Sequence, residues 1–157
     1  MLTLEWEPLR ALLDEGVEEM LAAHWKEVAV DQELIPLAPD WDRAFKLQQM
    51  GILRTAALRR DGRLIGYNAF HVLPHIHYRY TVHAVNDVVF VDPSERGQAG
   101  LKLIRGTEQL LREQGVVKIS YHTKVHTRVG VKQRSTVGDI LSRLGYRLDE
   151  EIYSLLL

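Results

Sequence analysis

A glycine-bearing turn between two apolar segments is the feature of this chain best suited to chemistry. The stretch reads Val88-Val89-Phe90-Val91-Asp92-Pro93-Ser94-Glu95-Arg96-Gly97-Gln98-Ala99-Gly100-Leu101-Lys102-Leu103-Ile104. Its β-branched start predicts a buried strand, and the spacing of its apolar residues after the turn predicts an amphipathic helix. The first N–H groups of a helix have no partner within it and lie at the positive end of the helix dipole. The turn therefore predicts a site for a phosphate or pyrophosphate group.

Histidines form a second set of candidates. His75 and His77 alternate along a segment that we expect to be extended, so they share one face. His122 and His126 would lie one turn apart if that segment were helical, and neutral imidazoles in such clusters bind Zn²⁺ or Ni²⁺. No Asp or Glu stands at a ligand spacing among them, however, and we expect a loop around residue 126. We therefore expect no metal, and we assign His77 and Tyr78 to substrate binding.

Composition limits the class of protein. With 157 residues, 46% hydrophobic and 26% charged, the chain is predicted to be one soluble domain over residues 1–157. The absence of cysteine excludes a disulfide scaffold, a thiolate metal site and a cysteine nucleophile. No apolar run approaches the about 20 residues that span a membrane, and no signal-peptide pattern opens the chain. We therefore expect a cytoplasmic protein that binds no membrane.

Charge is balanced overall but unevenly distributed. The net charge of −1 gives no support for nucleic-acid binding. Residues 118–134 carry only basic charges, which are either solvated surface or an attraction for an anionic ligand. The basic residues of this segment are Lys118, Lys124, Arg128, Lys132 and Arg134.

Periodicity predicts the elements before the turn. Apolar residues spaced by three and four predict a helix over about 8–28, and Asp40 is expected to cap a short helix that Gly51 ends. Arg60-Asp61-Gly62-Arg63 predicts a tight turn between strands 52–58 and 64–72. Pro74 is expected to end the second strand. Three tryptophans, Trp6, Trp25 and Trp41, are expected to pack in this region, or one of them to line an acceptor pocket.

The second half of the chain predicts one crossover. A strand over 85–91, a helix over about 100–115 and a strand over 116–121 imply a crossover between parallel neighbours. We expect a loop over 123–135, a helix over 137–144 that Gly145 ends, and a final strand over 151–157. The predicted fold class is α/β, a mixed and mostly antiparallel sheet with one parallel strand–helix–strand crossover, flanked by helices.

This order of elements resembles the GNAT superfamily of N-acetyltransferases over about residues 50–157. Two segments carry the resemblance. The stretch from Val89 to Gly100 looks like the family's acetyl-CoA motif, and Leu144-Gly145-Tyr146 is similar to the Leu-Gly-Phe/Tyr that ends its last helix. The Pro39-Asp40-Trp41 loop and His75-Ile76-His77-Tyr78 look most like small phage- or prophage-type members. The resemblance implies an acyltransferase that moves an acetyl group from acetyl-CoA directly to an amine with general base assistance.

The resemblance also implies roles for particular residues. The backbone groups of Val89, Phe90 and Val91 would pair with the pantetheine arm of acetyl-CoA. Asp87 is the first candidate for the base, because several family members place an acid there. His122 is the second, since its ordinary pKa near 6.5 suits that work. The amides that would hold the pyrophosphate are those of Arg96, Gly97, Gln98, Ala99, Gly100, Leu101 and Lys102.

Further candidates are less specific. Lys102, Lys124 and Arg128 are candidates for binding the 3′-phosphate of the donor. Tyr121 and Ser135 are candidates for donating a proton to the leaving thiolate.

Two departures from the family pattern leave an alternative open. The usual turn reads Gln/Arg-x-x-Gly-x-Gly/Ala, but counting from Arg96 the matching positions are Ala99 and Leu101. Leu141 stands where many members have a tyrosine acid. The alternative is a non-catalytic GNAT-like module that binds CoA or a protein partner. A nucleotide-binding protein is a less favoured interpretation, because the Lys-Ser/Thr of a P-loop does not follow the glycines. The acceptor, a small molecule or a protein amine, and a possible homodimer stay open.

Overall fold

The computed structural model describes residues 1–124, 126–128, 131–133 and 136–157. The chain divides into two compact units, residues 1–122 and residues 123–157. Each unit is considered by itself.

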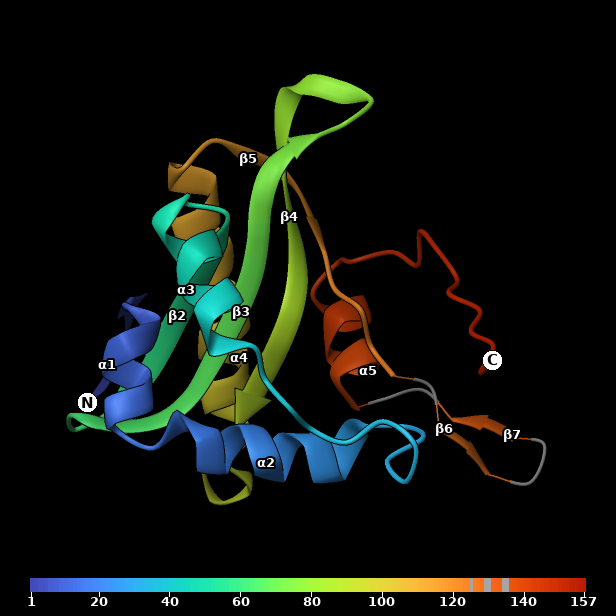
Figure 1. The fold of residues 1–157 in the computed structure, drawn as a ribbon. Helices are drawn as coiled ribbons and strands as arrows, with labels where there is room; N and C mark the ends of the chain where they lie inside the picture. The colour runs from blue at the N-terminus through green and yellow to red at the C-terminus, as the bar shows by residue number, and fades with distance from the viewer. Residues whose placement is uncertain (125, 129–130, 134–135) are drawn as a thin grey trace. The chain divides into compact units, whose positions relative to one another are not determined.

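The first unit is built on a five-stranded sheet in the order β1-β2-β3-β4-β5 (Figure 1). Neighbouring strands run antiparallel except β4 and β5, which are parallel and are joined through helix α4, Gln98–Glu113. This confirms the predicted fold class. The strands are β1 (Leu2–Trp6), β2 (Leu53–Arg60), β3 (Arg63–His75), β4 (Tyr78–Val91) and β5 (Val116–Ser120).

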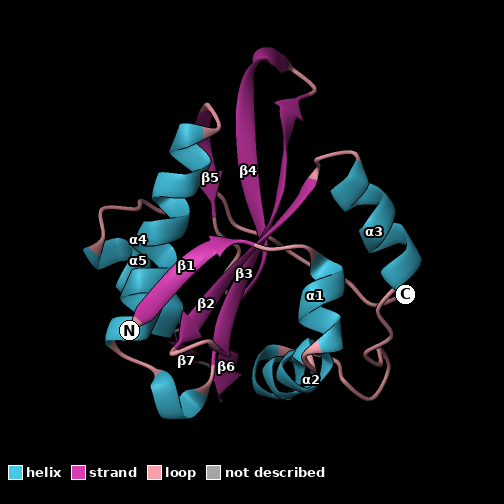
Figure 2. Cartoon of the chain, turned by 90° about the vertical axis from the view of Figure 1, so that its left-hand side faces the viewer, coloured by secondary structure: helices cyan, strands magenta, loops and turns pink. Residues whose placement is uncertain are grey.

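Helices cover both faces of this sheet (Figure 2). Helices α1 (Leu9–Asp14), α2 (Val17–Val28) and α3 (Trp41–Gln49) lie on one face, and α4 lies on the other. Alternation along the strands supplies both cores. The core on the α1–α3 face includes Leu12, Val17, Ala57, Tyr67 and Phe90, and the core on the α4 face includes Leu58, Ile65, Val91, Leu103 and Leu111.

The N-terminal region differs from the prediction in two ways. The single helix expected over 8–28 is two helices, because Gly16 adopts a φ of 85° between α1 and α2. Such a left-handed conformation interrupts a right-handed helix and suits glycine. Strand β1 was not predicted, although Leu2, Leu4 and Trp6 alternate with exposed Thr3 and Glu5. That alternation is the signal that would have found it.

The β2–β3 turn is confirmed. Asp61 and Gly62 both have positive φ, 50° and 85°, as a tight hairpin turn of this kind requires. The expectation that Pro74 ends the strand is wrong, since β3 continues to His75. Strand β2 begins only at Leu53, opposite His71, so Pro74 lies where β3 no longer pairs with β2. A proline without an N–H is tolerated at such an edge, and here a register shift also adjoins it.

Other local predictions hold. Asp40 caps α3, since its side chain accepts a hydrogen bond from the Arg43 N–H at 2.9 Å. Helix α4 runs close to its predicted bounds, although it begins two residues earlier, at Gln98. No helix among the described residues is both long and apolar enough to cross a membrane.

The second unit contains a short hairpin and a helix. Strands β6 (His126–Arg128) and β7 (Val131–Gln133) pair antiparallel where a loop was expected, so that expectation is wrong. Helix α5 (Thr136–Arg143) ends as predicted: Gly145 has a φ of 94°, and the Tyr146 N–H donates to the Leu141 carbonyl at 3.0 Å. The prediction of a final strand over 151–157 is wrong, because those residues form neither helix nor strand. An apolar alternation is not enough without a hydrogen-bonded neighbouring strand.

Candidate active site

Strands β4 and β5 part inside the sheet. Their parallel pairing covers Val82 to Val85 on β4 and ends at Val85 opposite Ser120. Strand β4 continues for six more residues, through Val89 and Phe90 to Val91, with no partner from β5. Backbone groups along this edge are therefore available to an extended ligand, which binds such an edge as an added strand does.

A β-bulge places Asp87 at the start of this open edge. Ala69 pairs with Val88 and Phe70 pairs with Asn86, so Asp87 is an extra residue on β4. The Asn86 amide holds the bulge, donating to Asn68 Oδ1 at 2.8 Å and to the Val88 carbonyl at 3.0 Å. Bulges re-aim side chains beside functional sites. Here Asp87 is exposed and lines a cavity on the α1–α3 face.

The same amide network reaches β5. The Asn68 amide also donates to the Tyr121 hydroxyl at 2.9 Å, and the Tyr121 ring meets Phe70 edge-on at 5.3 Å. Burial raises the pKa of Tyr121, so its hydroxyl keeps its proton at neutral pH. Tyr121 is thus fixed at the place where the two parallel strands part.

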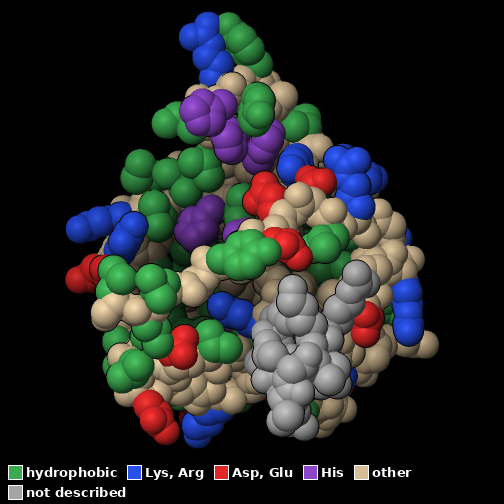
Figure 3. Space-filling view, turned by 90° about the vertical axis from the view of Figure 1, so that its right-hand side faces the viewer, with side chains coloured by type: hydrophobic (Ala, Val, Ile, Leu, Met, Phe, Trp, Pro, Cys, Tyr) green, Lys and Arg blue, Asp and Glu red, His purple; other side chains and the backbone are tan. Residues whose placement is uncertain are grey.

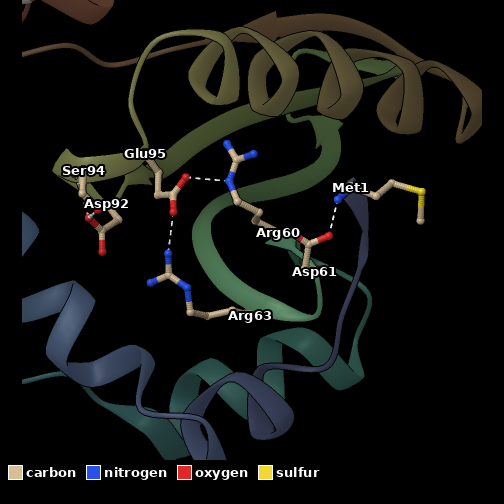
Figure 4. Close-up of polar contacts among 7 residues, drawn as sticks. All are labelled: Met1, Arg60, Asp61, Arg63, Asp92, Ser94 and Glu95. Atoms are coloured by element: carbon tan, nitrogen blue, oxygen red, sulfur yellow. Dashed lines mark hydrogen bonds and ion pairs between the residues drawn. The ribbon is translucent and has the colours of Figure 1, made fainter.

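The turn between β4 and α4 is fixed before it reaches the glycines. A short 3₁₀ turn, Pro93–Glu95, follows Asp92, whose carboxylate accepts from the Ser94 hydroxyl at 2.6 Å and the Ser94 N–H at 2.9 Å. These hydrogen bonds lower the pKa of Asp92. The Glu95 carboxylate bridges Arg60 and Arg63, which ties the turn to the β2–β3 hairpin (Figure 4).

Helix α4 begins immediately after Gly97. Gly97 has a φ of 95° and a ψ of −115°, a conformation that favours glycine, and α4 starts at Gln98. Glycine has no side chain to cap the helix, so no side-chain oxygen of Gly97 accepts a hydrogen bond from the first N–H groups of α4. Ala99 is buried against the sheet, whereas Leu101 and Lys102 are exposed. The start of α4 therefore has the features of an anion site that the sequence predicted.

Arg96 lies over the end of β4. Its guanidinium pairs with the Glu27 carboxylate of α2, donates to the Val91 carbonyl at 3.2 Å and lies 5.9 Å from the centre of the Phe90 ring. The Arg96 hydrogen bond lowers the pKa of Glu27. The ion pair is half exposed, with 45% of each side chain accessible, so it is weak enough to be exchanged for another anion.

His24 belongs to this region and was not predicted. Its ring lies 5.3 Å from that of Phe90, and burial lowers its pKa, so that it is neutral at pH 7. The charges of Glu27, Arg96 and Asp87 also act on the pKa of His24. The sequence did carry a signal for His24. Leu21 follows Val17 by four residues and His24 follows Leu21 by three, a spacing that places His24 on the apolar face of the helix.

A cavity of about 100 Å³ lies between α1, α2, α3 and the sheet. Its wall is mostly apolar, and Trp41 is part of it, held by a hydrogen bond from its indole N–H to Glu18 at 2.8 Å. The polar residues of the wall are Thr55, Tyr67 and Asp87. Of the three tryptophans, Trp41 is the one that lines this cavity.

The structure does not bring every predicted residue to this place. His122 is exposed, two residues beyond β5. His77 and Tyr78 lie at the β3–β4 hairpin tip; nine residues separate Tyr78 from Asp87, roughly 30 Å along an extended strand.

That hairpin tip carries a cluster of rings. The His75 ring lies 4.9–5.6 Å from the rings of His77, Tyr78 and His83 and is tilted against each of them, and Figure 3 shows histidines gathered there. Within the described part of the chain, no group of three or more metal-ligating side chains is arranged to hold an ion.

The remaining candidates lie beyond the first unit. Leu141 is buried, and its aliphatic side chain has no proton to donate. Lys124 is exposed. Ser135 and the Arg128 side chain lie outside the described residues.

The parted parallel strands, the bulge and the open helix start together define a mixed α/β fold with one open strand edge that leads to a helix start. A family model described as the acetyltransferase (GNAT) family matches residues 11–130. The chain therefore belongs to the GNAT acetyltransferase family.

Solved structures agree on the fold. An aminoglycoside acetyltransferase from an uncultured soil metagenomic sample superposes with a TM-score of 0.74 at 14% identity, covering 100% of this chain and 99% of that one. A ribosomal-protein-alanine N-acetyltransferase from Brucella melitensis gives 0.69 at 19% identity, covering 99% of each chain. Glucosamine-6-phosphate N-acetyltransferase from Arabidopsis thaliana gives 0.66 at 12% identity, covering 99% of this chain and 98% of that one. No curated protein sequence matches significantly.

Proposed function

We propose that this protein transfers the acetyl group of acetyl-CoA to a primary amine. The observation that carries the proposal is the open edge of β4, which runs from the Asp87 bulge to the Gly97 turn and the start of α4. In a chain of the GNAT family, one continuous surface then offers hydrogen bonds to an extended arm and to phosphates.

The donor would lie along this surface. The backbone of Val89, Phe90 and Val91 binds the pantetheine arm, and an N–H group of the open edge stabilises the oxyanion that forms from the thioester carbonyl. The amides from Arg96 to Lys102 hold the pyrophosphate at the start of α4. Arg96 exchanges its Glu27 partner for the pyrophosphate, whose two charges compare with one on the carboxylate.

The acceptor amine would approach from the α1–α3 face. Asp87 attracts the ammonium form and orients it, and His24, kept neutral by burial, is available to take its proton. The amine nitrogen attacks the thioester carbon, the C–S bond breaks, and CoA leaves as a thiol. Tyr121 directly follows β5, is held by the Asn68 amide of β3 and keeps its proton, so it is our candidate for the donor of the proton that the thiolate receives.

Thermal shift with acetyl-CoA and a thiol-release assay over a panel of amines test the proposal. Asp87→Asn should leave acetyl-CoA binding unchanged and lower kcat/KM at least about tenfold, because the acceptor loses a hydrogen bond to a charged group worth about 1.5–3 kcal/mol. Asp14→Asn, an exposed carboxylate at the end of α1, is the matched control. Binding of acetyl-CoA without thiol release from any amine would favour a non-catalytic CoA-binding module instead.

A further inference from the structure

The cavity beside Asp87 contains hydroxyl groups that nothing in the described structure satisfies. Thr55 and Tyr67 are 3% and 5% exposed, and neither Thr55 Oγ1 nor the Tyr67 hydroxyl has a hydrogen-bond partner there. A buried, unsatisfied polar group costs about 1–3 kcal/mol. Both residues line the same cavity, so a polar atom of a bound molecule would recover that cost.

The rest of the wall limits what that molecule can be. Leu9, Leu12, Leu21, Leu53 and the Trp41 ring form an apolar enclosure. Asp87 is the one charged residue of the wall, and it remains solvent-exposed. A ligand with one cationic end at Asp87 and an apolar body matches this distribution. A second ammonium group would be buried against leucines without a partner, which is strongly unfavourable.

The volume sets the size of the body. Cavities of about 150 Å³ bind benzene, which has six heavy atoms. A cavity of about 100 Å³ therefore accommodates about four heavy atoms. Aminoglycosides and long polyamines would leave most of their atoms and charges outside this cavity.

We propose that the acceptor is a small primary monoamine whose short aliphatic body fills this cavity while its nitrogen lies at Asp87 and donates to the unsatisfied hydroxyls of Thr55 and Tyr67. The inference rests on the proposed acetyl transfer and narrows its substrate class. The amine forms the new N–C bond to the acetyl carbon, the thioester C–S bond breaks, and the displaced N–H proton balances the thiolate. The products are an N-alkylacetamide and CoA.

Two alanine substitutions on helices form a matched pair for testing this inference. Ala44 of α3 lines the cavity, and Ala44→Leu fills part of it with three carbon atoms. Ala23 of α2 is exposed and outside the cavity wall, so Ala23→Leu adds the same atoms elsewhere. Leucine is nearly as good a helix former as alanine, so neither change disturbs its helix. Ala69→Val, a β-branched residue at a strand position of the same wall, is the second filling variant if Ala44→Leu fails to fold.

The probes are isobutylamine, spermidine and kanamycin, each titrated by calorimetry and assayed by thiol release. We expect isobutylamine to have the highest kcat/KM, and Ala44→Leu to weaken its binding and raise its KM at least tenfold. Acetyl-CoA affinity should not change in Ala44→Leu, and Ala23→Leu should behave as wild type. Preference for spermidine or kanamycin, or wild-type behaviour of both filling variants, would overturn the inference.

The binding measurement separates this inference from the proposed function. If calorimetry shows that isobutylamine binds and that Ala44→Leu weakens this binding, the cavity assignment is supported even without thiol release. Binding without thiol release would refute only the acetyl transfer. Thiol release with polycations only would refute the monoamine assignment and leave acetyl transfer standing.

Discussion

The assignment of the pyrophosphate to the start of α4 predicts a variant that is more stable and yet binds its ligand less well. Gly100 is the third residue of α4, and a Cβ added there meets no atom within 4 Å. Gly100→Glu therefore fits without displacing a neighbour. Replacing glycine in a helix gains about 1 kcal/mol, and a carboxylate in the first turn interacts favourably with the helix dipole. We expect the melting temperature to rise by about 2–4 °C.

The same carboxylate should repel the donor. Unit charges about 6 Å apart in a water-like dielectric interact by about 0.7 kcal/mol. A pyrophosphate with two charges is then repelled by about 1.4 kcal/mol, which is tenfold in affinity. We expect the Kd for CoA, measured by calorimetry, to increase at least tenfold.

A neutral variant isolates the effect of charge. Gly100→Gln adds nearly the same atoms without the charge, so its CoA affinity should fall much less than that of Gly100→Glu. The difference between the two variants should shrink as salt is added, because salt screens exposed charges. A folded Gly100→Glu protein that binds CoA as tightly as wild type would show that the pyrophosphate does not lie at the start of α4.

Two further predictions concern the strand and the histidine beside this site. A Cβ at Gly66 would lie 2.7 Å from the Phe90 carbonyl oxygen and 3.2 Å from Val91 Cα. Gly66→Ala should therefore lower the free energy of unfolding, measured by urea titration, by about 1–3 kcal/mol and weaken CoA binding. Unchanged stability would mean that β3 and β4 separate easily. Because burial lowers the pKa of His24 below 6.5, the unfolded chain takes up the extra proton at a higher pH than the folded protein does, and stability should fall as the pH drops below 6.5. His24→Asn should reduce the difference in unfolding free energy between pH 7.5 and 5.5. An equal difference in wild type and variant would assign the acid sensitivity to other groups.

Features that depend on a few neighbouring residues were predictable from the sequence. The Asp61-Gly62 turn, the Asp40 cap, the Gly97 turn into α4 and the Gly145 helix end are each specified by residues within one turn of each other. Their conformations follow from local sterics and local hydrogen bonds. The failures have the complementary cause, since Pro74 and residues 151–157 depended on whether a neighbouring strand was present.

By itself the sequence determined the family-like order of elements and the position of the glycine turn before α4, together with Asp87 as the residue to examine. Only the tertiary structure decided that β5 leaves β4 at Val85, that a bulge turns Asp87 toward the α1–α3 face, and that His24 approaches Phe90. It alone brought Thr55 and Tyr67 into one apolar cavity. Strand register and packing between distant segments are set by contacts over long separations in the chain, which local patterns do not encode.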